Sequence, residues 1–311
     1  MANNRTYKAR SVAVNGVTIN GVSGLTIGGV TTVVESTPDG APGVEEIDSA
    51  WHAVSVSLTM TDVTKIAALM ASTPAAGMIW HTKNASGANW SKHTLMGAGV
   101  LWTGFTFAST PDADATATMT GSMIWSDADD SFDDVLKVES DISSDPGFSR
   151  PTRLYRPNTC ICYATGSVTL DHVLNFNMSM SAANLIQSAV DTDFGPTAMN
   201  VEAWGPLLFD VQFEETKEVT GTDKAQAQAA IALSEAARED FTIKFRGRGA
   251  GADQTLTIHD PKLIDITQVF GAGYTAESLN CRQPWMDATG SPLSGVFQGA
   301  GGGEYNMFVF A

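Results

Sequence analysis

Residues 50–60 read AWHAVSVSLTM, and residues 203–213 read AWGPLLFDVQF. Both segments begin with Ala-Trp, and Trp51 and Trp204 are 153 positions apart. In the first segment small and polar residues alternate with valines and a leucine, which is the period of a β-strand with one buried face. Similar elements surround both segments in the same order, so the sequence predicts two related β-rich halves.

The chain before the first segment also indicates strands. Residues 11–34 are rich in β-branched residues, and the Asn15-Gly16 and Asn20-Gly21 pairs supply the positive φ that tight hairpin turns need. Residues 35–50 contain two prolines and two glycines, and this composition predicts a long loop.

After the first segment, residues 61–71 have the apolar spacing of a helix of about three turns, with Thr61 or Asp62 as the N-cap. Residues 78–95 indicate a hairpin, and further strands are expected at 99–107 and 116–125.

The second half repeats this order. Strands containing Cys160 and Cys162 come first, and a long loop is expected at 184–200. Strand 204–213 and an Ala-rich helix at 222–238 follow. A hairpin begins at Phe241, which is 163 positions after Met78 at the start of the first hairpin. The predicted elements end with strands at 262–270 and 278–286.

We therefore expect a mainly β fold with two tandem β-sandwich or barrel modules, each with one flanking α-helix and a long loop. The expected division is an N-terminal arm at 1–10, a first module at 11–126, an acidic linker at 127–149, a second module at 150–290, and a Gly-rich C-terminal arm at 291–311.

Composition narrows the classes of function. The chain has 311 residues, 43% of them hydrophobic, and a formal net charge of −16. A surface this acidic disfavours a basic groove for nucleic acid and docking on anionic membranes. The sequence contains no apolar run of the roughly 18–20 residues that span a bilayer and no secretory signal pattern, so we expect a soluble protein made in the cytoplasm.

Charge is concentrated in one segment. Residues 127–146 hold eight acidic residues and one lysine, which indicates a linker or an exposed arm. Three arginines follow it, and we expect them to face neighbouring subunits where the acidic segment provides partners. The residues in these expected contacts are Arg150, Arg153, Arg156, Asp129, Asp130, Asp133 and Asp134.

No catalytic or metal-binding constellation is predicted. The five histidines have none of the usual metal-ligand spacings, and no G-x-S-x-G nucleophile motif occurs. Cys160 and Cys162 could form half of a zinc site, but two small buried side chains are the favoured interpretation. GRGAGAD at 247–253 lacks the phosphate-loop signature and indicates a hairpin turn. We expect no catalytic residue, no cofactor and no metal.

The C-terminal end is apolar and follows a Gly-rich tether. Met307, Phe308, Val309 and Phe310 should each contribute roughly 1.5–3 kcal/mol when buried, before the entropy of ordering. We expect residues 305–311 to be ordered, packed either on the core or on an adjacent subunit.

This order of elements resembles the major tail tube proteins of long-tailed, siphovirus-type bacteriophages and, more distantly, the type VI secretion tube protein. The resemblance implies a structural virion protein, not an enzyme, that self-assembles into stacked rings forming a helical tail tube. Single-module members form six-fold rings, and duplicated modules imply a homotrimer that makes a pseudo-hexameric ring.

The resemblance also implies location and partners. The protein would lie in the virion tail and contact copies of itself and the tape-measure, tail-terminator and distal-tail proteins. Double-stranded DNA would pass through the tube during ejection without specific binding. Because basic contacts would slow that passage, we expect a lumen of neutral or negative potential.

Two other classes of protein fit the sequence. One is another β-rich virion component, such as a distal-tail or baseplate protein or a capsid decoration protein. A weaker one is a carbohydrate-binding or hydrolytic β protein. Electron microscopy distinguishes tubes or stacked rings from discrete plugs or monomers, and glycan binding would indicate the last class.

Overall fold

Strands dominate the computed structural model, with 73% strand and 5% helix among the described residues, so the predicted mainly β class is confirmed. The structure describes a set of ranges that omits several connecting segments. These ranges are 10–36, 46–75, 77–83, 89–126, 136–142, 153–162, 168–170, 173–188, 195–215, 240–248, 251–258, 261–270, 275–283 and 308–310.

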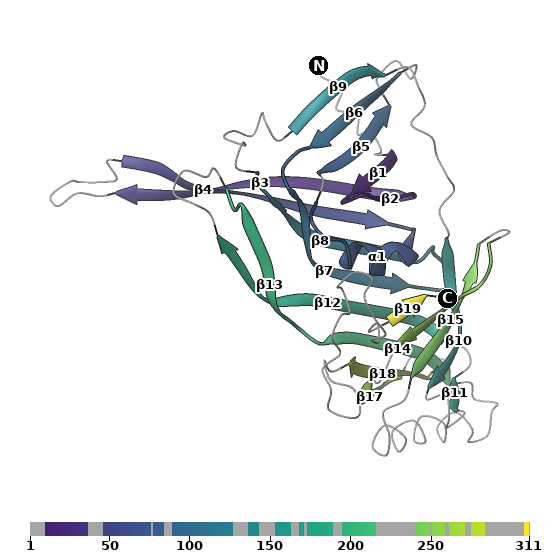
Figure 1. The fold of residues 1–311 in the computed structure, drawn as a ribbon. Helices are drawn as coiled ribbons and strands as arrows, with labels where there is room; N and C mark the ends of the chain where they lie inside the picture. Colours follow the sequence, from purple (N-terminus) through teal and green to yellow (C-terminus); the bar gives the residue numbers. More distant parts are fainter. Residues whose placement is uncertain are drawn as a thin grey trace.

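The first half, residues 10–142, contains nine strands and one short helical segment among its described residues (Figure 1). Its elements are β1 (Arg10–Val14), β2 (Val17–Ile19), β3 (Val22–Ser36), β4 (Glu46–Met60), a 3-10 turn η1 (Val63–Lys65), α1 (Ile66–Met70), β5 (Met78–Lys83), β6 (Trp90–Leu95), β7 (Gly99–Ser109), β8 (Thr116–Ile124) and β9 (Leu136–Ile142).

The second half, residues 153–310, contains ten strands among its described residues. They are β10 (Leu154–Cys162), β11 (Val168–Leu170), β12 (Val173–Ser188), β13 (Ala198–Trp204), β14 (Leu207–Glu215), β15 (Phe241–Gly247), β16 (Gln254–Ile258), β17 (Lys262–Phe270), β18 (Thr275–Gln283) and β19 (Phe308–Phe310).

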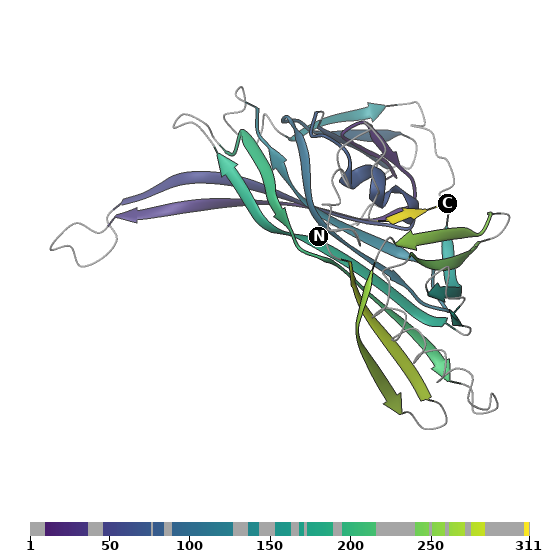
Figure 2. The same cartoon turned by 60° about the horizontal axis from the view of Figure 1, so that its bottom comes forward.

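These strands form three antiparallel sheets. Two are five-stranded, with the orders β2-β1-β5-β6-β9 and β11-β10-β15-β16-β19. The third is nine-stranded and has the order β17-β18-β14-β12-β7-β8-β4-β3, with β13 paired to β12 beside this path. Both five-stranded sheets lie on the same side of the nine-stranded sheet (Figure 2).

The two halves have the same strand connectivity. The five-stranded orders become identical when β1, β2, β5, β6 and β9 are matched with β10, β11, β15, β16 and β19. Within the long sheet, the first half contributes β3-β4-β8-β7 and the second half contributes β12-β14-β18-β17, which is the same order again.

Irregularities in the strands recur at matching places. The β3–β4 pairing has a register shift between Val22 and Gly24, and the β12–β14 pairing has one between Val173 and Asn175, 151 positions later. A β-bulge adds a residue and bends the strand locally. A β-bulge at the same position of two hairpins is a more specific similarity between the halves than shared strand order.

A second shift recurs in the next hairpin of each half. It lies between Trp102 and Gly104 in the β7–β8 pairing, and between Leu263 and Asp265 in the β17–β18 pairing, 161 positions later. Strand order and both bulge positions therefore coincide in the two halves.

The register also gives Trp51 and Trp204 matching places. Trp51 lies nine residues before Met60, the partner of Val22, and Trp204 lies nine residues before Phe213, the partner of Val173.

One face of the nine-stranded sheet is buried, and we call it the covered face. In β4 the side chains of Val56 and Leu58 are 1% and 0% exposed, and in β14 those of Phe209 and Val211 are 3% and 0% exposed. These positions are two residues apart, so the alternation seen in the sequence is that of a sheet with one covered face. A single apolar cluster spans both halves.

Strands occupy both ends of each predicted long loop. β3 extends to Ser36 and β4 begins at Glu46, so the loop expected at 35–50 is wrong at both ends. Likewise β12 extends to Ser188 and β13 begins at Ala198, within the loop expected at 184–200. Backbone pairing thus extends both hairpins into the predicted loops, and residues 37–45 and 189–194 lie outside the described residues.

The helix expected at 61–71 is shorter than predicted. A 3-10 turn precedes a single α-helix at Ile66–Met70, and the Asp62 side chain makes no capping hydrogen bond. Instead, the Thr64 hydroxyl donates to the Asp62 carboxylate over 3.2 Å. The second predicted helix, at 222–238, lies outside the described residues.

Two further boundaries differ from prediction. Part of the expected acidic linker at 127–149 forms β9, which pairs with β6 at the edge of a five-stranded sheet. The strand expected at 204–213 is two strands, because Gly205-Pro206 separates β13 from β14. Proline has no amide hydrogen for strand pairing, which explains the interruption.

Candidate functional site

The two halves are joined edge to edge within the long sheet. β7 from the first half and β12 from the second half pair antiparallel over six residue pairs, from Ser109 opposite Phe176 to Gly104 opposite Ser181. We call this pairing the internal joint. It makes one continuous sheet out of a four-stranded part from the first half and a five-stranded part, which includes β13, from the second half.

Aromatic rings cover the internal joint on the covered face. The ring of Phe107 in β7 lies 5.6 Å from Phe176, 5.5 Å from Phe245 and 6.2 Å from Phe310, measured between ring centroids. All three partners belong to the second half, and Phe107 is 1% exposed. The joint is therefore part of the hydrophobic core as well as a set of backbone hydrogen bonds.

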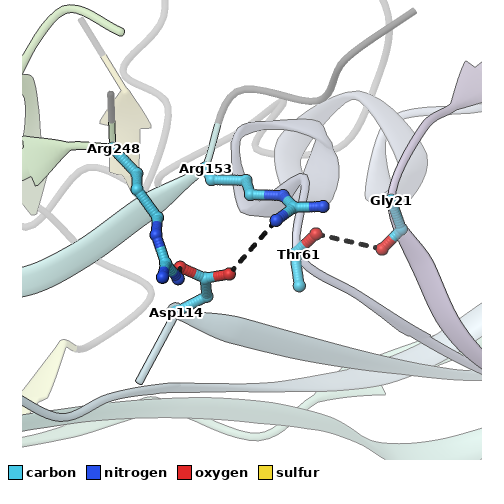
Figure 3. A network of polar contacts seen from close by, with 5 residues as sticks. All are labelled: Gly21, Thr61, Asp114, Arg153 and Arg248. Carbon is cyan, nitrogen blue, oxygen red and sulfur yellow. Dashed lines mark hydrogen bonds and ion pairs between the residues drawn. The ribbon is translucent and has the colours of Figure 1, made fainter. Parts of the chain in front are cut away.

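A charged cluster holds the end of the same joint (Figure 3). Asp114, between β7 and β8, lies 3.7 Å from the Arg153 guanidinium and also accepts a hydrogen bond from Arg248. Next to it, the Ala115 amide donates to the Leu154 carbonyl over 2.6 Å. Asp114 belongs to the first half and its partners to the second, so these contacts fix the two halves relative to each other.

The β12–β13 hairpin also rests on the first half. The Trp125 amide donates to the Pro196 carbonyl over 2.9 Å. Gly195 lies so close to the Trp125 indole and the His52 carbonyl that any β-carbon there would overlap them. The close approach, not backbone strain, requires glycine at this position.

The nine-stranded sheet ends in two strands that have only one partner each among the described residues. β3 pairs with β4 alone at one end, and β17 pairs with β18 alone at the other. We call β3 and β17 the free edges. By the matched strand order, β3 corresponds to β12 and β17 to β7, which are the two strands of the internal joint.

The free edges are only weakly protected against edge-to-edge pairing, because the charges along them are few: Glu35 in β3, and Lys262 and Asp265 in β17. Proteins commonly block such edges with proline, charge or shortness. β3 is 15 residues long, and its sequence VSGLTIGGVTTVVES has no proline and no lysine. β17 is nine residues long and has a single lysine at its first position, and Ile264 within it is 52% exposed.

The other face of the long sheet, which we call the open face, is mostly uncharged and polar. Its positions alternate with the covered ones in each strand. They include Thr106, Thr118, Thr120, Ser55, Ser57, Ser179, Asn177, Asn280 and Gln212. Over β7, β12, β14, β17 and β18 this face is hollowed by about 670 Å³.

Few charges interrupt the open face near this hollow. Asp210, Asp265 and Arg282 line the hollow. Burial raises the pKa of the Asp210 carboxyl, and a hydrogen bond from the Asn177 amide over 3.1 Å opposes that rise. Hydroxyl and amide groups are therefore frequent among the described residues of this face, where Lys262 and Arg282 form one pair of opposite basic residues.

Only some of the residues predicted to contact other subunits lie within the described part of the chain. Arg153 forms an ion pair with Asp114 of its own chain. Arg156 lies in β10, and its side chain is outside the described part. Arg150, Asp129, Asp130, Asp133, Asp134 and Met307 lie outside the described residues. Their proposed contacts remain predictions.

Two of the C-terminal apolar residues, Phe308 and Phe310, pack on the core of their own chain. β19 pairs with β16, which places Val309 opposite Thr257. Phe308 is 2% exposed, and its ring centroid lies 5.5 Å from that of Phe105. Of the two expected places, core and adjacent subunit, these two phenylalanines are found in the core.

Sequence reasoning did not identify Asp114, the Trp125–Gly195 contact or the internal joint. Each connects residues that are far apart in the chain, and Asp114 and Arg248 are 134 positions apart. The one signal in the sequence was the offset of 153 to 163 residues between matching elements of the halves. This offset matches their strands but says nothing about which edges meet.

The described residues contain no group of three or more His, Cys, Asp or Glu side chains placed to hold a metal ion. No helix in the described part is long and apolar enough to cross a membrane. Comparison with protein-family models and with curated proteins finds no match to this chain.

Proposed function

We propose that this chain is a structural subunit of a bacteriophage tail tube, which assembles with copies of itself into stacked rings. The observation that carries the proposal is the pair of free edges, β3 and β17, at opposite ends of a sheet whose internal joint uses the corresponding strands. Among the described residues one edge of each kind has no second partner strand, so successive copies could continue the sheet with the same strand order.

The matched halves support the proposal that the chain arose from a duplicated module. Shared strand order, two bulges at equal offsets and the places of Trp51 and Trp204 are the supporting observations. Two modules per chain would give a trimer six equivalent positions, the pseudo-hexameric ring implied by the resemblance. A head-to-tail contact of this kind closes into a ring when its rotation allows closure.

The open face supports a role as a conduit. If the sheet closes with its covered face outward, the hydroxyl and amide groups of the open face would line the lumen. Such a wall makes few contacts to phosphate and gives little salt-dependent retention of DNA. In this proposal the protein has no catalytic activity or cofactor and is located in the virion tail.

Negative-stain electron microscopy of the purified protein over a range of concentrations tests the proposal, together with light scattering for the mass of the smallest assembly. Stacked rings or tubes built from trimers are the expected result. Discrete plugs that never stack would indicate a distal-tail, baseplate or decoration protein. A monomer at all concentrations would refute the proposal.

A further inference from the structure

We propose that β3 of one copy pairs antiparallel with β17 of the next copy in the register of the internal joint, with Thr26 opposite Val269. This inference rests on the proposed function and specifies the contact that would build the ring. The partner is a second copy of this chain, because the same two kinds of edge already meet once inside it.

The register follows from the offsets between the halves. The bulge in β3 and that in β12 are 151 positions apart, and those in β7 and β17 are 161 positions apart. In the internal joint Ala108 of β7 lies opposite Asn177 of β12. Residue 108 in β7 matches residue 269 in β17 by the offset of 161, and residue 177 in β12 matches residue 26 in β3 by the offset of 151. The same pairing at the free edges therefore places Val269 opposite Thr26.

The same operation on the other pairs gives the whole contact. The expected pairs are Leu25 with Phe270, Thr26 with Val269, Ile27 with Gln268, Gly28 with Thr267, Gly29 with Ile266 and Val30 with Asp265.

This register keeps the two faces of the sheet continuous across the contact. Leu25 and Ile27 pack against the core in β3, whereas the Thr26 side chain is exposed on the open face. In β17 the exposed side chain of Thr267 would lie on the same open face, opposite Gly28. A slip of one residue would place Leu25 and Ile27 opposite residues whose side chains lie on the other face of the sheet.

The two contacts differ at one position. In the internal joint a β-carbon on Gly104 would lie only 2.8 Å from the Met180 backbone carbonyl. Asp265 takes the matching position in β17. We therefore expect the two strands to lie slightly further apart at this end of the contact between copies than in the internal joint.

Cysteine cross-linking between two different molecules tests the register. Thr26→Cys and Val269→Cys proteins are mixed, allowed to assemble under reducing conditions, and then oxidised. Opposite residues in an antiparallel pair have Cα atoms about 4.5–5.5 Å apart, within the range of a disulfide. A non-reducing gel should show a cross-linked dimer that neither protein gives alone beyond the wild-type background.

The matched control mixes Thr26→Cys with Asp265→Cys, which lies on the same strand four residues out of register. The two Cα atoms would then be roughly 13 Å apart, too far for a disulfide. We expect at least a tenfold lower yield from this control. A second in-register pair, Gly28→Cys with Thr267→Cys, tests the same register if the first pair impairs assembly or folding.

The outcomes separate this inference from the proposed function. Rings or tubes by microscopy with equal yields from both mixtures, or with more from the control, would overturn the register and leave the tube proposal intact. If the wild-type protein never assembles, both are overturned. Selective cross-linking by either in-register pair supports the inference.

Discussion

The β3–β4 hairpin and the β12–β13 hairpin occupy matching places in the two halves, yet their surroundings differ. The β12–β13 hairpin rests on the first half, where Gly195 packs against Trp125. The outer part of the β3–β4 hairpin, where Val33–Ser36 pairs with Glu46–Ser49, contacts no other strand among the described residues (Figure 2).

The difference between the hairpins comes from their position in the chain and not from their fold. A chain of two similar halves joined once has one joint filled and leaves one edge of each kind open. The second-half hairpin shows what surrounds such an element when a neighbouring module is present. In our proposal a neighbouring copy supplies the same surroundings to the first-half hairpin.

The largest expected effect comes from breaking the internal joint at Phe107. Phe107→Ala removes a buried ring that contacts Phe176, Phe245 and Phe310, and we expect the free energy of unfolding to fall by about 3–5 kcal/mol. Urea denaturation measures the change.

The control for this variant is Thr106→Ala, on the open face of the same strand, which should change stability by no more than about 0.5 kcal/mol. A similar small loss for both variants would mean that the aromatic cluster does not stabilise the joint.

A smaller effect is expected from separating the second-half hairpin from Trp125. Gly195→Ala forces a β-carbon into the Trp125 indole and the His52 carbonyl, and we expect a loss of about 1–3 kcal/mol from overpacking. Denaturation followed by tryptophan fluorescence measures it.

Gly24→Ala is the control for this variant, because a β-carbon there would lie an ordinary 3.6 Å from Thr59. If Gly195→Ala is as stable as this control, the hairpin does not need its close contact with the first half.

Much of the fold could be predicted because apolar and polar residues alternate along a strand that has one covered face. The strands around Val56 and Val211 follow that period, and the offset of 153 found from the tryptophans equals the offset of the paired residues Met60 and Phe213. The offset of 163 between Met78 and Phe241 also agrees with the strand pairing. Met78 pairs with Val14 in β1, and Phe241 pairs with Cys162 in the matching strand β10.

Other features could not be predicted because local composition opposed the tertiary structure. β9 reads LKVESDI, and its charges indicated a linker although it pairs with β6 at a sheet edge. The pairing of β7 with β12 has no connecting turn to signal it, and their paired residues are more than 60 positions apart. Strand edges that pair only in the folded chain produce no periodic pattern in the amino-acid sequence.

An effect smaller still is expected at the charged end of the joint. Asp114→Asn removes two ion pairs, to Arg153 and Arg248, whose side chains are 47% and 59% exposed. Solvent screening limits such pairs to about 0–1 kcal/mol, and we expect a loss within that range that shrinks in 1 M salt because salt screens exposed charges.

Glu139→Gln is the matched control for Asp114→Asn. It breaks the 3.2 Å pair of Glu139 with Lys92, which lies wholly within the first half. Glu139 is 62% exposed and Asp114 only 17%, so the control should lose less. Equal losses measured by urea denaturation would show that the ion pairs between the halves have no special importance.

The smallest effect concerns a charge that distinguishes the halves on the open face. Asp210 occupies the position that matches Ser57, 153 residues earlier, and burial raises its pKa above the ordinary 3.8. A raised pKa in the folded state means that the protonated form favours folding, so this contribution to stability is present at low pH and is lost as pH rises through the folded-state pKa. Asp210→Asn should therefore be more stable than wild type at pH 7, with the difference disappearing below the ordinary pKa.

Asp253→Asn should show the opposite sign. The Gly247 amide donates to the Asp253 carboxylate over 3.2 Å and lowers its pKa, so Asp253→Asn should be less stable than wild type at pH 7. Urea denaturation of the three proteins between pH 3 and 8 measures both differences, and a destabilised Asp210→Asn at pH 7 would show that the Asn177 hydrogen bond outweighs the burial of the charge.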